Sequence, residues 1–256
     1  MIQNILRIAK EAGKEAMKFY GSSEGTVQKE DESPLTLADC ASHRCIEKLL
    51  REAYPDIPVL SEESAEGELK GRSGWSRFWL VDPLDGTKEF IKQSGEFTVN
   101  IALVEGNAPV AGVIHAPVLR KSWWGEKGEG VFLQEAESAP KPLQSRPWKE
   151  ETPVFVASRD HAGPMVKKLF AKYPSAETTS MGSSLKFCLV AEGKADLYLR
   201  DVPTMEWDTA AAQIIVEEAG GQVTDLEGNR LTYNKEVLRN PALLTRGDSS
   251  FWPDIG

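Results

Sequence analysis

Two aspartates stand three residues apart directly after an apolar segment that predicts a buried strand. Phe78-Trp-Leu-Val81 leads into Asp82-Pro-Leu-Asp85-Gly-Thr87. Because Pro83 and Gly86 favour a turn, both carboxylates can face one point in space. Hard cations such as Mg²⁺ prefer oxygen ligands, and the N–H groups and hydroxyl of Gly86 and Thr87 suit a phosphate oxygen. By itself the pattern also fits an ordinary surface turn, since Asp, Pro and Gly are common turn residues.

Three further acidic residues lie where elements of secondary structure are predicted to begin or end. Glu62 follows the short apolar strand Val59-Leu60, where a carboxylate is costly unless it is solvated or neutralised by a cation. Asp39, in Thr36-x-x-Asp39, matches a helix capping box with Asp in place of Glu or Gln. Asp208 precedes Thr209-Ala-Ala-Ala212 and predicts a helix N-cap. A capping role is compatible with catalysis, because phosphate binds favourably at helix N-termini.

The bulk composition excludes several classes of function. A net charge of −9 disfavours nonspecific nucleic-acid binding and binding to an anionic membrane surface. No segment is apolar for long enough to predict a membrane span, and residues 1–20 predict an amphipathic helix rather than a signal peptide. Three cysteines without CxxC spacing disfavour disulfides and structural zinc and suit a reducing cytoplasm. We therefore expect a cytoplasmic protein without stable membrane insertion, and peripheral contact with the inner membrane stays open.

The order of predicted elements indicates an α+β fold. Residues 21–35 predict a loop, and a helix follows as far as Ala53. Strands at 98–104, 110–115, 122–124 and 130–132 predict an antiparallel meander. Strands and helices alternate after residue 150, which favours sheet layers covered by helices. A stretch rich in Pro and Lys at 139–149 suggests a division into an N-terminal half, 1–145, with most acidic site residues, and a C-terminal half, 146–256.

Four segments together resemble the inositol monophosphatase superfamily in order and spacing. They are Thr36-Leu-Ala-Asp39, Ser61-Glu-Glu-Ser64, Trp79-Leu-Val-Asp82-Pro-Leu-Asp85-Gly-Thr87 and Trp207-Asp-Thr-Ala-Ala211. Within the superfamily the chain looks like the 3′(2′),5′-bisphosphate nucleotidase branch. The segments that carry this closer match are Leu84–Ile91, Gly95–Ala102 and Gly182–Gly193. The resemblance covers nearly the whole chain and implies a layered αβαβα sandwich of the sugar-phosphatase type, as in fructose-1,6-bisphosphatase.

The resemblance also implies a metal site. Glu62, Asp82 and the backbone carbonyl of Leu84 would hold one Mg²⁺, and Asp82, Asp85 and Asp208 a second. Asp39 would position a water, with a third and weaker ion as an open alternative, and Thr87 would assist Asp39. The catalytic residues implied are thus Asp39, Thr87 and Glu62, acting on a water that attacks phosphorus in line, without a phosphoenzyme.

Binding of a bisphosphate by an acidic protein requires local positive charge besides the metals. Lys186 and Arg200 are the candidates for clamping the phosphate that is not cleaved, although isolated Lys and Arg residues are mostly exposed surface cations. Their positions match nucleotide contacts of the nucleotidase branch, as do those of Ser183 and His161. The full set of predicted substrate contacts is Glu62, Leu84, Asp85, Gly86, Thr87, His161, Ser183, Lys186, Arg200 and Asp208. His43 and His115 are expected to be structural.

The resemblance predicts hydrolysis of adenosine 3′,5′-bisphosphate to AMP and phosphate in sulfur metabolism, with its 5′-phosphosulfate analogue as a further substrate. Lithium sensitivity is expected from the family. A rival prediction is a phosphatase for inositol phosphate or fructose bisphosphate. A noncatalytic metal-binding protein is a rival from another class, disfavoured because no residue of the predicted metal site is missing. Monomer and homodimer both stay open, and no nucleic-acid partner is expected.

Overall fold

The larger of the two main sheets has seven strands in the computed structural model, which describes residues 1–21, 27–28, 34–35, 37–157 and 163–253. Its strand order is β3-β4-β5-β6-β7-β8-β9, and every pair is antiparallel except the parallel pair β3–β4. The strands are β3 Val59–Ser61, β4 Arg77–Asp85, β5 Thr98–Glu105, β6 Ala108–Ala116, β7 Lys121–Glu126, β8 Gly130–Glu135 and β9 Lys141–Pro142. The predicted antiparallel meander is therefore confirmed.

A five-stranded sheet, in the order β11-β10-β12-β14-β13, lies in the second half of the chain. Its strands are β10 Val154–Val156, β11 Glu177–Thr179, β12 Leu197–Arg200, β13 Gln222–Asp225 and β14 Leu243–Arg246. The α-helices are α1 Ile2–Met17, α2 Leu37–Ala53, α3 Thr87–Ile91, α4 Pro164–Lys172, α5 Leu185–Ala191 and α6 Ala210–Glu218. A pair of short strands, β1 Val27–Gln28 and β2 Pro34–Leu35, precedes α2.

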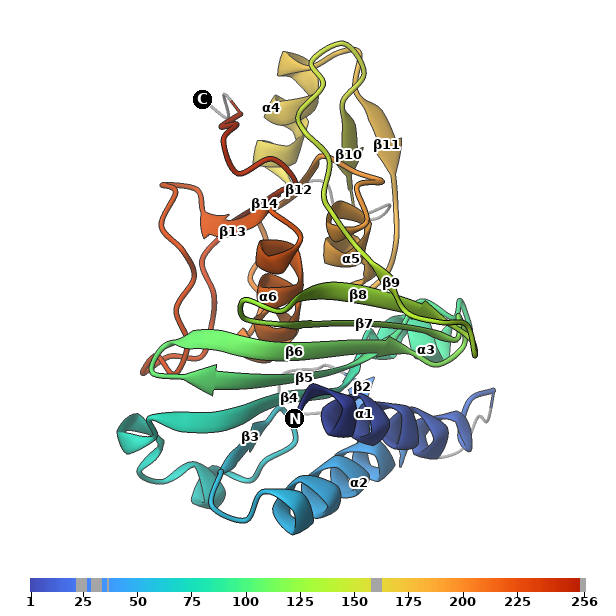
Figure 1. Ribbon diagram of the computed structural model, residues 1–256, viewed down its shortest axis with the longest axis vertical. Helices are drawn as coiled ribbons and strands as arrows, with labels where there is room; N and C mark the ends of the chain where they lie inside the picture. Colours follow the sequence, from blue (N-terminus) through green and yellow to red (C-terminus); the bar gives the residue numbers. More distant parts are fainter. Residues whose placement is uncertain (22–26, 29–33, 36, 158–162, 254–256) are drawn as a thin grey trace.

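The elements stack in five layers (Figure 1). Helices α1 and α2 cover one face of the large sheet, α5 and α6 lie between the two sheets, and α4 covers the outer face of the small sheet. The predicted α+β fold with layered αβαβα architecture is confirmed. Helices α5 and α6 pack against both sheets through one core cluster. The division of the chain into halves at 145–146 stays a prediction.

Both faces of the large sheet are buried, which explains its near-continuous apolar strands. In β4, Trp79 and Val81 face α1 and α2, whereas Phe78 and Leu80 face α5 and α6. This alternation follows from the two-residue period of a strand. Among the described residues, no helix has the length and apolarity to cross a membrane.

The structure corrects several local predictions. The loop predicted at 21–35 contains the β1–β2 pair, and the turn predicted after Asp85 continues into the short helix α3. Strands β11 and β14 were not predicted, because three or four residues give little periodic signal. Asp208 is not the N-cap of α6: it ends a 3-10 helical turn, Glu206–Asp208, and Thr209 takes the N-cap position.

Candidate active site

The parallel pairing of β3 with β4 brings Glu62 beside Asp82. Ser61 pairs with Val81, and the Glu62 N–H donates to the Val81 carbonyl at 3.1 Å. Glu62 and Asp82 therefore leave the same edge of the sheet on neighbouring strands. Only about 1% of Asp82 is exposed, and one of its oxygens, Oδ1, accepts a hydrogen bond of 3.0 Å from the Leu84 N–H.

An irregularity in β4 places Asp85 next to this pair. The register with β5 shifts between Asp82 and Asp85, where Pro83 has no N–H to donate to the ladder. The Pro83 carbonyl instead accepts a hydrogen bond of 2.6 Å from the Ser42 hydroxyl on α2. This bulge lets two carboxylates three residues apart point toward the same region.

Gly86 ends the strand in a conformation that favours glycine. Its φ is +92°, and a Cβ placed there would lie 3.1 Å from the Ser183 Cβ. A side chain at this position would be strained by the backbone and would also crowd the loop before α5. Gly86 thus lets the chain turn into α3 while Ser183 approaches the end of β4.

Asp208 comes from the other side of the pocket, at the start of α6. Its Oδ2 accepts a hydrogen bond of 2.8 Å from the Met205 N–H, which fixes the carboxylate on its own 3-10 turn. The Tyr233 hydroxyl contacts Thr209 at 3.2 Å and Gln213 at 2.7 Å, so these two hydrogen bonds hold the beginning of α6 in place.

The four predicted metal-binding carboxylates form one electrostatic cluster. Burial, followed by repulsion from Glu62, Asp85 and Asp208, raises the pKa of Asp82 well above its usual range. Burial and the charge of Asp85 likewise raise the pKa of Asp208. Carboxylates that raise one another's pKa are stabilised when they bind either protons or metal cations.

The donor set fits divalent cations that prefer oxygen ligands. Every candidate ligand is a carboxylate or a backbone carbonyl, as Mg²⁺ requires. In the conformation of the described residues, however, no three acidic, histidine or cysteine side chains are arranged to hold an ion. Like charges repel, and each of Asp82, Asp85 and Asp208 turns one oxygen to a protein donor. The cluster is therefore close in space without being in coordination geometry.

Asp39 and Thr87 meet at the edge of this cluster. Asp39 is buried in the first turn of α2, and its Oδ1 accepts a hydrogen bond of 3.3 Å from the Thr87 hydroxyl. The same hydroxyl lies 3.5 Å from the Leu84 carbonyl oxygen. The predicted pairing of Thr87 with Asp39 thus has a direct contact in the structure. Thr36, the other half of the predicted capping box, lies outside the described residues.

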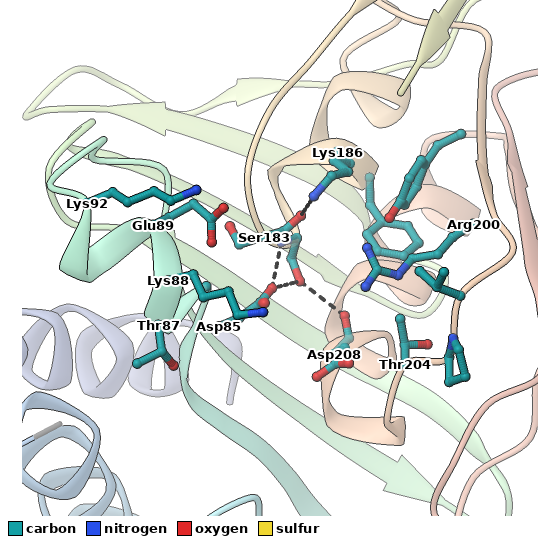
Figure 2. Close-up of a pocket in the computed structure, with 16 residues that line it drawn as sticks. Asp85, Thr87, Lys88, Glu89, Lys92, Ser183, Lys186, Arg200, Thr204 and Asp208 are labelled. Carbon is teal, nitrogen blue, oxygen red and sulfur yellow. Dashed lines mark hydrogen bonds between the residues drawn. The ribbon is translucent and has the colours of Figure 1, made fainter. Parts of the chain in front are cut away.

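A pocket of about 490 Å³ opens over Asp85 and Asp208. Figure 2 shows these carboxylates below Lys186 and Arg200, with Lys88 beside Asp85. The predicted substrate residues Asp85, Gly86, Thr87, Ser183, Lys186, Arg200 and Asp208 all line the pocket. Glu62 and Leu84 do not line it. They are related to it through Asp82, which accepts the Leu84 N–H and is repelled by the Glu62 charge. His161 lies outside the described residues.

Lys186 is a buried cation without a carboxylate partner among the described side chains. Only 7% of it is exposed, and its ammonium group donates to the Ser183 carbonyl at 3.2 Å and lies 5.9 Å from the Tyr198 ring centre. Burial lowers its pKa. The Nε of Arg200 is buried and has no hydrogen-bond partner in the described part of the chain. Two such cations facing one pocket suit an anionic ligand.

Sequence reasoning missed other residues at this site. Lys88, Tyr198 and Thr204 line the pocket, and Asn100 and Ser184 contact Asp85 directly. Asn100 did give a signal, since it is an amide within the apolar strand Thr98–Val104. Ser184 gave none, because a serine before a helix usually indicates a cap.

Comparison with known proteins places these residues in a family context. Residues 1–247 match the family model described as "Inositol monophosphatase family". Over 244 residues the chain is 45% identical to the 3′(2′),5′-bisphosphate nucleotidase CysQ of Salmonella typhimurium, with 94% of this chain and 97% of the relative covered. The CysQ of Escherichia coli K12 gives the same identity and coverage.

Solved structures of similar proteins share the fold of this chain. The CysQ crystal structure from Bacteroides thetaiotaomicron superposes with a TM-score of 0.81 at 37% identity, covering 96% of each chain. An inositol monophosphatase from Thermotoga maritima has a TM-score of 0.75 at 24% identity, covering 96% of this chain and 91% of its own. At that identity the likeness concerns the fold alone.

Proposed function

Since the chain belongs to the inositol monophosphatase family, we propose that it is a Mg²⁺-dependent 3′(2′),5′-bisphosphate nucleotidase. The proposed reaction converts adenosine 3′,5′-bisphosphate to AMP and inorganic phosphate, with the 5′-phosphosulfate analogue as a further substrate. Its place would be the clearance of bisphosphate nucleotides in sulfur metabolism. The observation that carries the proposal is one pocket lined by both Asp85 and Asp208 and by the cations Lys186 and Arg200.

In this proposal the carboxylates hold the cations. Glu62, Asp82 and the Leu84 carbonyl would bind one Mg²⁺, and Asp82, Asp85 and Asp208 a second. When bound, such ions supply charge neutralisation for the phosphoryl group and acidify a water. The raised pKa of Asp82 supports this assignment, because divalent cations would relieve the repulsion among these buried groups.

The distribution of charge orients the substrate. The phosphate to be cleaved lies over the carboxylate end of the pocket, and the other phosphate binds Lys186 and Arg200. Guanidinium and ammonium groups form strong, charge-assisted hydrogen bonds with phosphate. Tyr198, Phe187 and Pro203 add apolar lining for the nucleoside. A monophosphate such as inositol phosphate cannot fill both ends.

Asp39 and Thr87 prepare the attacking water. The hydrogen bond of 3.3 Å from the Thr87 hydroxyl to the Asp39 carboxylate orients both groups at the end of β4. Asp39 then accepts a proton from water as that water attacks phosphorus from the side opposite the leaving oxygen. The bond from phosphorus to the 3′-oxygen of the nucleoside breaks, that oxygen takes a proton from solvent water and leaves as an alcohol, and inorganic phosphate is released. Because catalysis relies on positioning and charge, no covalent nucleophile is required.

A substrate panel tests the assignment. We expect kcat/KM for adenosine 3′,5′-bisphosphate to exceed that for inositol monophosphate by at least about 100-fold, because the monophosphate lacks the second phosphate and with it a charge-assisted contact of about 3 kcal/mol. Fructose 1,6-bisphosphate keeps a second phosphate but lacks the nucleoside proposed to lie against Tyr198 and Phe187, so its kcat/KM should also be lower. Phosphate release with Mg²⁺ would be measured for each substrate, with and without Li⁺. Equal kcat/KM values for inositol monophosphate and the nucleotide would contradict the nucleotidase assignment and favour a sugar phosphatase.

Asp85→Asn tests the metal assignment. It keeps the size of the side chain and removes the charge, so we expect a folded protein with kcat reduced about 10³-fold or more, the scale of losing one essential electrostatic contact. Circular dichroism and thermal melting would verify the fold. A variant with the wild-type kcat would show that Asp85 is not part of the site.

A further inference from the structure

One oxygen of Asp85 is held by three donors of the protein. Oδ2 accepts hydrogen bonds from the Ser184 N–H at 2.6 Å, from the Ser184 hydroxyl at 2.6 Å and from the Asn100 amide at 3.3 Å. The other oxygen, Oδ1, accepts none from any residue that the structure describes. The carboxylate is thus fixed through one oxygen only.

The side chains of Asn100 and Ser184 form a short, buried chain of hydrogen bonds that ends at Asp85. The Asn100 amide donates to the Ser184 hydroxyl oxygen at 2.9 Å, and of the two acceptors near that hydroxyl the charged Asp85 Oδ2, at 2.6 Å, is closer than the Asp208 carbonyl oxygen, at 3.1 Å, so the single hydroxyl proton favours Asp85. Asn100 and Ser184 are each only 1% exposed, so water does not compete for these groups. Hydrogen bonds to a charged acceptor in such surroundings are strong.

The same hydroxyl oxygen also lies close to the other side of the site. It lies 3.1 Å from the backbone carbonyl oxygen of Asp208, while Asp85 belongs to β4 and Ser184 precedes α5. A single side chain therefore contacts the segments that carry two of the proposed metal ligands. Figure 2 labels Asp85 and Asp208 on the two sides of this contact.

We propose that Ser184, oriented by Asn100, is a positioning residue that holds Asp85 so that Oδ1 faces the divalent cation. This inference rests on the proposed function, because it assigns Asp85 to a cation site. Groups that hydrogen-bond a metal ligand typically change metal affinity or activity 10- to 100-fold when they are removed. Ser184 touches neither the ion nor the substrate in this role and acts through the rotamer of Asp85.

Direct binding of Mg²⁺ provides the readout. Isothermal titration calorimetry and the Mg²⁺-dependent shift in melting temperature would be measured for the wild type, Ser184→Ala, Asp85→Asn and the double variant. We expect Ser184→Ala to weaken Mg²⁺ binding about 10-fold, at the lower end of the range, since the Ser184 N–H still donates to Asp85. At saturating Mg²⁺ its kcat should return to within about 3-fold of the wild-type value, because the ion itself then orders the carboxylate.

Ser145→Ala is a matched control. Ser145 is also a buried serine whose hydroxyl contacts backbone carbonyl oxygens, those of Ala219 at 2.9 Å and Gly247 at 2.6 Å. It lies outside the pocket lining, so its loss should lower the melting temperature without changing Mg²⁺ affinity. Should Ser184→Ala fail to fold, Asn100→Ala removes the orienting amide while Ser184 remains, and a loss of Mg²⁺ affinity of about 3-fold is expected.

The outcomes separate the inference from the proposed function. If Asp85→Asn binds Mg²⁺ as tightly as the wild type, the metal assignment itself is wrong. If Asp85→Asn loses affinity but Ser184→Ala and Asn100→Ala do not, only the inference is overturned. In the double variant, Ser184→Ala should add no loss to that of Asp85→Asn. An additive loss would show that Ser184 acts through another group.

Discussion

A glycine in the large sheet sets how closely α6 approaches the active site. A Cβ added at Gly112 on β6 would lie 2.8 Å from the Cα and the carbonyl oxygen of Ala211 and 2.6 Å from the Ile214 side chain. Carbon atoms in contact prefer about 3.5–4.0 Å, so Gly112→Ala must displace the backbone of α6 by roughly 0.7–1 Å. Because Asp208 lies two residues before Ala210, where this helix begins, the displacement reaches the carboxylate cluster.

The expected cost follows from overpacking. A methyl group forced into a well-packed core costs typically about 1–3 kcal/mol, and the upper half of that range applies because the obstacle is helix backbone. For a chain of this size each kcal/mol lowers the melting temperature by about 2–4 °C, so we expect a decrease of about 4–12 °C. A displacement of about 1 Å at Asp208 would also lower kcat up to about 100-fold.

Gly125→Ala is the comparison that isolates the clash. Gly125 faces the same helix from β7, but an added Cβ would lie 3.4–3.7 Å from its nearest neighbours, in ordinary contact. Urea denaturation and steady-state kinetics would be measured on both variants. We expect Gly125→Ala to keep its free energy of unfolding within about 1 kcal/mol and its kcat unchanged. Equal stability and activity of the two variants would refute the argument that Gly112 sets the position of α6.

Two further predictions follow from buried ionisable groups. Burial lowers the pKa of His115 from 6.5 to about 4, so below pH 6.5 the unfolded chain binds a proton that the folded chain does not. The free energy of unfolding should therefore fall on acidification, by about 2 kcal/mol between pH 7 and pH 5, and urea denaturation of His115→Gln should lack this contribution. Asp208→Asn should raise the melting temperature of the metal-free protein above pH 6, because burial and the charge of Asp85 raise the pKa of Asp208 to about 8 and the wild-type carboxylate must therefore take up a proton on folding, while the stabilisation by Mg²⁺ should decrease. A metal-free Asp208→Asn protein that melts below the wild type would contradict the repulsion inferred for the cluster.

The layered fold could be predicted because its large elements carry strong periodic patterns. The amphipathic stripe of α1 identifies a helix and the face that it buries, and the continuous apolar segment Phe78-Trp-Leu-Val81 of β4 identifies a strand that is buried on both faces. Strands β11 and β14 were missed because their short segments acquire strand geometry from their neighbours in the sheet. Helix α3 was missed because it is only five residues long and starts at a glycine with positive φ.

The acidic residues of the site were visible in the sequence, but their surroundings were not. Asp82 and Asp85 are close in the chain, whereas the approach of Asp208 depends on how α6 packs on β6. The N-cap prediction for Asp208 was wrong by one position, because a 3-10 turn intervenes before the helix. The contact of Ser184 with Asp85 joins residues 99 positions apart, and no local pattern encodes such a distance.

The charges of the pocket also explain why a bisphosphate suits it better than a metal ion or a phosphate alone. Buried carboxylates such as Asp82 raise one another's pKa, and the buried Lys186 has no carboxylate partner among the described side chains. Cations would relieve only the first of these unfavourable arrangements, and a free anion only the second. In the proposed binding mode a bisphosphate with its divalent cations would relieve both at once, since one phosphate would bind the ions and the other would bind Lys186 and Arg200. Each ligand thereby removes part of the cost of binding the other, and their affinities must be coupled reciprocally.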